Sequence, residues 1–110
     1  MSYKVKTTPR FENEAKRIAK KYKGIKSDIA KLIEDLSINP ETGTPIGGNL
    51  YKIRLAISGT NKGKSGGARV ITCVIVLSEV VYLAEIYLKN EYDTVDTNLV
   101  VQRLKDEGLI

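Results

Sequence analysis

The sequence predicts an α+β fold: a small antiparallel sheet with an N-terminal helical hairpin packed on one face, in the order β-α-α-β-β-β-α. Three observations predict it. Residues 9–39 carry apolar side chains at helical spacing, residues 50–57 alternate apolar and charged side chains, and residues 68–88 are dominated by β-branched and apolar side chains. The 110-residue length, with 42% hydrophobic and 28% charged residues, fits a single domain over residues 1–110. We expect the sheet face opposite the helices to be free for function.

The N-terminal third predicts one strand and two helices. Residues 3–7 predict a half-buried strand, because Tyr3, Val5 and Thr7 alternate with two lysines. Thr8 and Pro9 then supply the cap and the first-turn proline of a helix. Gly24 interrupts the helical pattern, and a second apolar stripe ends before Pro40. These two segments predict the helical hairpin.

The remainder predicts a loop, three strands and a final helix. Residues 40–49 are rich in proline and glycine and predict a loop. Residues 50–57 predict a strand with one cationic side, and residues 68–77 predict a central strand covered on both faces. Residues 80–88 follow a tight turn, so these two long strands form an antiparallel pair, and residues 97–107 predict a short helix.

Charge and composition exclude several classes of protein. The net charge of +5 favours an anionic partner, either a nucleic acid or an acidic protein. The chain has no histidine, and its single Cys73 lies in the most apolar strand, so we expect no disulfide, no metal site, no cofactor and a reducing compartment. Neither a long apolar run nor a signal-like start is present, which predicts a cytoplasmic protein that does not contact a membrane.

The stretch "SGTNKGKSGG" at residues 58–67 is similar to a phosphate-binding P-loop, but the spacing excludes that function. Gly59 and Gly63 enclose three residues, whereas the P-loop needs four, and the next segment predicts a strand instead of a helix. The stretch is therefore interpreted as a flexible loop that presents Lys62 and Lys64.

Cations gather in the segment from residue 50 to residue 69, which has five positive charges and no acid. Lys52 and Arg54 are two positions apart in one strand, so their side chains point the same way with Cα atoms roughly 7 Å apart. Arg69 opens the next strand close to them. The five cations are Lys52, Arg54, Lys62, Lys64 and Arg69.

The last strand adds other chemical groups to this face. Alternation predicts Glu85, Tyr87 and Lys89 on one side and apolar residues on the other. Cations, a tyrosine and one carboxylate can bind a phosphodiester, stack a base and assist proton transfer. Structural alternatives stay open: the strand cations can be a solvated side, Tyr87 a half-buried aromatic, and Glu85 a neutralising partner of Lys89 or Arg54.

The chain resembles the RelE/ParE toxin superfamily, most closely its HigB-like branch. The resemblance is most specific in "LYKIRLAISGTNKGKSGGARVI" followed by "IYLKNE". Members are small basic toxins of type II toxin–antitoxin operons with a helical hairpin on an antiparallel sheet. RelE-like members act in the ribosomal A site, where they cut mRNA without a metal by attack of a ribose 2′-hydroxyl on the adjacent phosphate.

The resemblance implies roles for particular residues. Lys52, Arg54 and Arg69 match the basic catalytic set, and Lys89 matches a basic position at the end of the last strand. RelE has an arginine at the position of Asn90 and a tyrosine at that of Asp96, so Tyr87 or Tyr92 is expected in place of that tyrosine. The RNA-binding residues implied are Lys62, Lys64 and Tyr92. The implied partners are mRNA in the ribosomal A site and a cognate antitoxin, expected to be a small DNA-binding protein.

Cleavage through a cyclic phosphate needs a base for the 2′-hydroxyl, cations for the charge on phosphorus and an acid for the leaving oxygen. Either a lysine close to other cations or Glu85 can be the base, and we favour the lysine. Arg54 and Arg69 stay charged and stabilise the transition state. Two other functions stay open: a ParE-like gyrase inhibitor, and a non-catalytic RNA- or protein-binding module. The basic strand face favours the nuclease.

Overall fold

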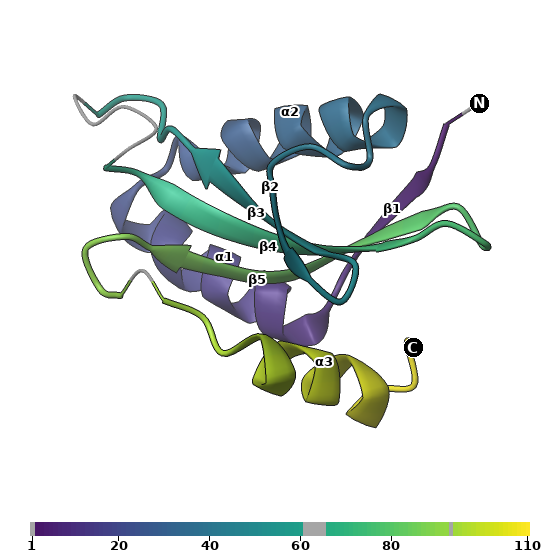
Figure 1. Ribbon diagram of the computed structural model, residues 1–110. Coiled ribbons are helices and arrows are strands. Elements are labelled where there is room, and N and C mark those ends of the chain that lie inside the picture. The colour runs from purple at the N-terminus through teal and green to yellow at the C-terminus, as the bar shows by residue number, and fades with distance from the viewer. Residues whose placement is uncertain (1, 61–65, 93) are drawn as a thin grey trace.

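The computed structural model describes residues 2–60, 66–92 and 94–110, which form a five-stranded sheet with helices on both faces (Figure 1). The strands have the spatial order β1-β5-β4-β3-β2, with β1 parallel to β5 and all other pairs antiparallel. The elements are β1 (Lys4–Thr7), α1 (Pro9–Lys21), α2 (Ile25–Ile38), β2 (Thr44–Gly47), β3 (Leu50–Leu55), β4 (Ala68–Ile75), β5 (Val80–Leu88) and α3 (Thr97–Asp106). The α+β class with an N-terminal helical hairpin is confirmed.

The start of α1 is fixed to the sheet by its capping residue. The Thr8 hydroxyl accepts a hydrogen bond from the Phe11 N–H at 3.1 Å, as an N-cap does, and donates to the Ala84 carbonyl at 3.1 Å. The Thr8 N–H also donates to the Leu83 carbonyl. Helix α1 therefore begins at a defined point on β5.

The turn between the two helices contacts the segment that follows β3. A Cβ atom on Gly24 would lie 2.3 Å from the Ser58 carbonyl oxygen, so only glycine fits there. Asp28, in the first turn of α2, accepts hydrogen bonds from both the N–H and the hydroxyl of Ser58. The first residue of the glycine-rich stretch is thus tied to the hairpin.

Two apolar clusters lie on opposite sides of the sheet. The hairpin packs on one face, with Phe11, Ile18 and Leu36 among its buried residues, and Val100 and Leu104 of α3 pack on the other (Figure 1). The prediction that the second face is free is therefore wrong in part, because α3 covers the side of β5. None of the described helices is long and apolar enough to cross a membrane.

The sheet differs from the predicted one in three details. The segment predicted as a loop contains β2, which pairs with β3 at an edge where Pro45 is tolerated because an edge strand can lack one N–H donor. Strand β1 runs parallel to β5, which makes the sheet mixed. In addition, β4 ends at Ile75, and Val76 and Leu77 are exposed instead of covered.

A β-bulge in β5 breaks the predicted alternation of side chains. Ile71 pairs with Glu85 but the next residue of β4 pairs with Leu83, which leaves Ala84 as the extra residue. After the bulge, Ile86 packs in the cluster under the hairpin, whereas Tyr87 packs in the cluster under α3. The prediction that the apolar residues of this strand share one face is therefore wrong, because the bulge places Ala84 and Ile86 on opposite faces.

Candidate functional site

Three of the predicted site cations lie side by side on the face that α3 only partly covers. Strand β3 supplies Lys52 and Arg54, and β4 supplies Arg69, whose Cα atom is the register partner of Arg54. Arg69 is in turn the register partner of Tyr87 on β5. Arg54, Arg69 and Tyr87 thus form a row across three adjacent strands, which the sequence alone could not specify because it depends on strand register.

The cations of the row differ in burial. Arg54 is exposed and Lys52 is half-buried, but Arg69 is only 2% exposed, and its Nη1 donates to the Ala68 carbonyl at 3.1 Å. The expectation that Arg69 stands on an open face is wrong, because it lies on a central strand between neighbours on both sides. A guanidinium stays charged even when buried, so Arg69 is a fixed positive charge.

An open cleft of about 710 Å³ brings these cations together with the edge strand. One side presents Lys52, Arg54 and Arg69, and the other is formed by residues on and before β2, which sequence reasoning treated as a plain loop. Gly43 is required at this junction because its φ is +105° and a Cβ atom there would lie 2.6 Å from the Lys52 carbonyl oxygen. The remaining lining residues are Thr42, Gly43, Thr44, Ile46 and Ile53.

Two tyrosines form a stack at the end of the row. The rings of Tyr87 and Tyr92 have centroids 4.5 Å apart and an interplanar angle of 15°. Tyr87 is fully buried, whereas Tyr92 is 46% exposed. Partial burial raises the pKa of Tyr92, so its phenol stays protonated at neutral pH. Tyr92 is therefore the ring that a ligand in solvent could contact, and the buried ring of Tyr87 stacks against it.

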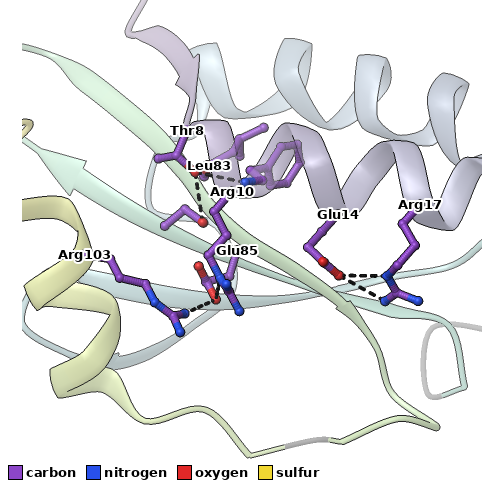
Figure 2. A network of polar contacts seen from close by, with 9 residues as sticks. Thr8, Arg10, Glu14, Arg17, Leu83, Glu85 and Arg103 are labelled. Atoms are coloured by element: carbon purple, nitrogen blue, oxygen red, sulfur yellow. Dashed lines mark hydrogen bonds and ion pairs between the residues drawn. The ribbon is translucent and has the colours of Figure 1, made fainter. Parts of the chain in front are cut away.

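The predicted carboxylate Glu85 is held by two arginines that sequence reasoning missed. Arg10 donates from Nε and Arg103 from Nη1 to the same oxygen, Oε1, at 2.8 and 2.9 Å (Figure 2). The structural alternatives considered for Glu85, pairing with Lys89 or Arg54, are replaced by this contact. The bond to Glu85 raises the pKa of Arg10.

The sequence did contain a signal for the two arginines. A buried carboxylate needs a cationic partner, and Arg10 beside the helix-starting Pro9 and Arg103 beside the apolar stripe of the last predicted helix could have been considered for Glu85. What the sequence lacked was the contact between the start of α1, the bulge of β5 and α3.

The remaining predicted residues lie away from the cleft. Lys89 is exposed just beyond β5, and its N–H donates to the Gly67 carbonyl at 3.1 Å. Asp96 is the N-cap of α3, with Oδ1 accepting from the N–H groups of Asn98 and Leu99 at 3.0 and 3.3 Å. The loop lysines Lys62 and Lys64 fall outside the described residues.

This fold is found in solved structures of the E. coli toxin RelE. One is a RelE mutant in the free state with two arginines replaced by alanine: the TM-score is 0.66 and the identity 17%, over 94% of this chain and 99% of that one. The second is the isolated E. coli RelE toxin, with a TM-score of 0.59 and 19% identity over 93% and 98% of the two chains. No protein-family model and no curated protein sequence matches this chain. The architecture is therefore a RelE-like toxin fold.

Proposed function

We propose that this chain is the toxin of a type II toxin–antitoxin system and acts as a ribosome-dependent mRNA endoribonuclease. The observation that carries the proposal is the row of Arg54, Arg69 and Tyr87, with Lys52 beside it in the same cleft. Cations on adjacent strands of a rigid sheet form a preorganised site for a phosphodiester. The RelE-like fold supports the same function.

In the proposed reaction the ribose 2′-hydroxyl attacks the adjacent phosphorus, and the bond to the 5′ oxygen of the next nucleotide breaks. The products are a 2′,3′-cyclic phosphate and a 5′-hydroxyl. Arg54 and Arg69 stabilise the charge that develops on the phosphoryl oxygens. The positive charge that a metal ion would otherwise supply comes from side chains.

Lys52 is the proposed general base. It lines the cleft and is half-buried, whereas Glu85 is engaged by two guanidinium groups through one oxygen. That pairing favours a positioning role for Glu85 over a role in proton transfer. Lys89, Lys62 and Lys64 are proposed to contact RNA phosphates, and Tyr92, backed by Tyr87, to stack on a base.

The proposal includes a cytoplasmic location, the ribosomal A site as the place of action, and a cognate antitoxin. A +5 chain with clustered cations should associate rapidly with an acidic or amphipathic partner in a salt-dependent way. We expect a neighbouring reading frame to encode a small DNA-binding antitoxin that co-purifies with this chain at low salt. Assignment to the HigB-like branch also stays a prediction.

The decisive experiment is translation with purified ribosomes, a defined mRNA and the purified chain, with cleavage mapped by primer extension. We expect cuts only when ribosomes are present, and none with the double variant Lys52→Ala, Arg54→Ala. Pulse labelling after induction in bacteria should show that protein synthesis stops first. If DNA synthesis stopped first while protein synthesis continued, the ParE-like alternative would replace this proposal.

A further inference from the structure

A second pocket lies on the other side of the tyrosine stack, away from the cation cleft. Its volume is about 320 Å³, within the range of small ligand sites. Arg10 of α1, Glu85 of β5 and Arg103 of α3 line it, and Tyr92 forms another part of its wall. The remaining lining residues are Thr94, Val95, Asp96, Leu99 and Val100.

Arg10 and Arg103 line this pocket together with two carboxylates, of which Glu85 pairs with the arginines and Asp96 caps α3. Two guanidinium groups share one carboxylate, so the cluster of Arg10, Glu85 and Arg103 has a net charge of +1 (Figure 2). The side chains of Arg10 and Arg103 are 43% and 34% exposed, although Glu85 beneath them is buried. Among the described residues, Glu85 is the only hydrogen-bond partner of either guanidinium, and each guanidinium has five N–H donors. Donors therefore remain to bind an anion from solvent.

We propose that this pocket binds a nucleotide of single-stranded RNA next to the one in the cation cleft, with its phosphate on Arg10 and Arg103 and its base on Tyr92. The inference rests on the proposed function for the source of the RNA. Guanidinium groups match phosphate oxygens in pairs, and an exposed aromatic ring accepts any base. Glu85 acts as a positioning residue that holds both arginines at the pocket.

The position of the pocket along the sheet supports a continuous RNA path. Glu85 is two residues from Tyr87 on β5, roughly 7 Å along the strand, and Tyr87 is the register partner of Arg69. Tyr92 stacks on Tyr87 and lines the pocket, so it lies between the cation row and the arginine pair. A strand whose phosphate occupies the cleft can therefore place the neighbouring nucleotide over Tyr92.

A nucleotide fits this pocket better than an acidic peptide segment does. The exposed ring of Tyr92 gives a stacking surface that a carboxylate side chain does not use. Asp96 also lines the pocket, but its Oδ1 already caps α3, where it accepts two N–H groups. An acidic peptide would gain only the contact with the two arginines.

The test is a binding titration of the full chain, without ribosomes, using an RNA trinucleotide whose 2′-hydroxyls are methylated so that it cannot be cleaved. Arginine side-chain NMR signals report the contact directly, and we expect those of Arg10 and Arg103 to shift on binding. Arg10→Ala should weaken binding about tenfold, the loss of one charge-assisted contact. It should also lower the salt-dependence slope by about 0.7, as expected for one lost phosphate contact.

The matched control is Arg17→Ala. Arg17 lies on the same helix, pairs with Glu14 and Glu91, and makes the same change of net charge without lining the pocket. We expect its affinity and salt slope to stay close to those of the parent chain. Equal weakening by Arg10→Ala and Arg17→Ala would overturn the inference, because net charge alone would then explain the effect.

A second variant should strengthen RNA binding, whereas Arg10→Ala should weaken it. Glu85→Gln removes the negative charge but keeps an amide oxygen that can accept from both arginines and hold them in place, so a folded Glu85→Gln chain should bind the trinucleotide several-fold more tightly. Weaker binding by Glu85→Gln, or binding of an acidic peptide but no RNA, would overturn the inference. Because none of these measurements needs cleavage, the pocket can fail while ribosome-dependent cutting holds, and cutting can fail while the pocket holds.

Discussion

Strands β4 and β5 are buried on both faces, but the two faces differ in chemistry. On β4 and β5 the face toward the helical hairpin carries aliphatic side chains, for example Val70, Val81 and Ile86. The face toward α3 carries the buried charged residues Arg69 and Glu85 among its apolar ones. On these two strands the hairpin side is therefore purely apolar in its core, whereas the α3 side buries two charged groups, Arg69 and Glu85, among its apolar ones.

The energetic difference between the faces follows from burial. A buried aliphatic side chain contributes about 1.5–3 kcal/mol relative to an exposed one. A buried charge costs free energy unless it is paired and hydrogen-bonded, and Glu85 meets that condition through Arg10 and Arg103. The α3 side therefore stabilises the fold less per buried residue, and its order depends on a few specific contacts.

The largest expected effect separates the faces with one type of substitution. Ile86→Ala and Ile71→Ala remove the same side chain from the hairpin side and the α3 side, and each should cost about 2–5 kcal/mol of unfolding free energy, measured in urea. At a temperature where both variants stay folded, only Ile71→Ala should slow cleavage, because Ile71 is the register partner of Lys52 and Glu85. Equal activity losses would contradict the comparison.

The next effect concerns the cations of the cleft. Arg69→Ala, and the double variant Lys52→Ala, Arg54→Ala, should each slow cleavage a hundredfold or more, about 3 kcal/mol of transition-state stabilisation. Arg69→Lys should restore only part of the rate, because lysine keeps the charge but loses the planar fork. Lys62→Ala or Lys64→Ala should do less, since the sequence predicts that these lysines supply only screened attraction to phosphate.

Stability provides the control for this ranking. Arg54→Ala should change the unfolding free energy by no more than about 0.5 kcal/mol, as for an exposed site. Arg69→Ala should cost about 1–3 kcal/mol, because Arg69 is buried and bonded to a carbonyl. If the loop lysines were essential and Arg69 dispensable in folded variants, the site would lie on the loop instead of the sheet.

Much of the fold was predictable because local signals agreed with the final structure. Thr8 caps α1, and Gly24 lies in the turn that separates the two helices of the hairpin. Strand β5 spans residues 80–88, as the apolar pattern indicated. The missed β2 contains Pro45 and Gly47, whose local preference for turns is overridden by pairing with β3. Parallel pairing of β1 has no local signal at all.

The residue types of the candidate site could be predicted from the sequence, but the way the strands bring them together could not. Lys52, Arg54 and Arg69 were found because strand periodicity and sequence distance place them together. The bulge at Ala84 was not predictable, because one inserted residue changes which face each later side chain meets. The partners of Glu85 were missed for a different reason: they come from helices 75 and 18 residues away in the chain.

Helix α1 contributes an arginine to two ion pairs, one with a buried glutamate and one at the surface. Arg10 meets the buried Glu85 on the α3 side, and Arg17 meets Glu91 at the surface, through two bonds of 2.7 and 3.0 Å. The Arg17 and Glu91 side chains are 47% and 36% exposed, so water and salt screen their attraction. The same residue types should therefore matter much less at the second position.

The smallest expected effect is the pH dependence of this exposed pair. Hydrogen bonds from Arg17 lower the pKa of Glu91, so the folded state favours the charged carboxylate. A lowered carboxyl pKa gives stability that is present above the ordinary value of about 4.3 and is lost as the pH falls through the folded value.

Glu91→Gln should thus cost only about 0.2–1 kcal/mol at pH 7, and the two proteins should converge in stability as the pH falls below about 4. Urea titrations of both proteins across this range measure the difference, and 1 M salt should reduce it at pH 7. A difference that persisted in acid, or that exceeded the cost of Glu85→Gln at pH 7, would show that the surface pair and not the α3 side holds the more important ionic contact.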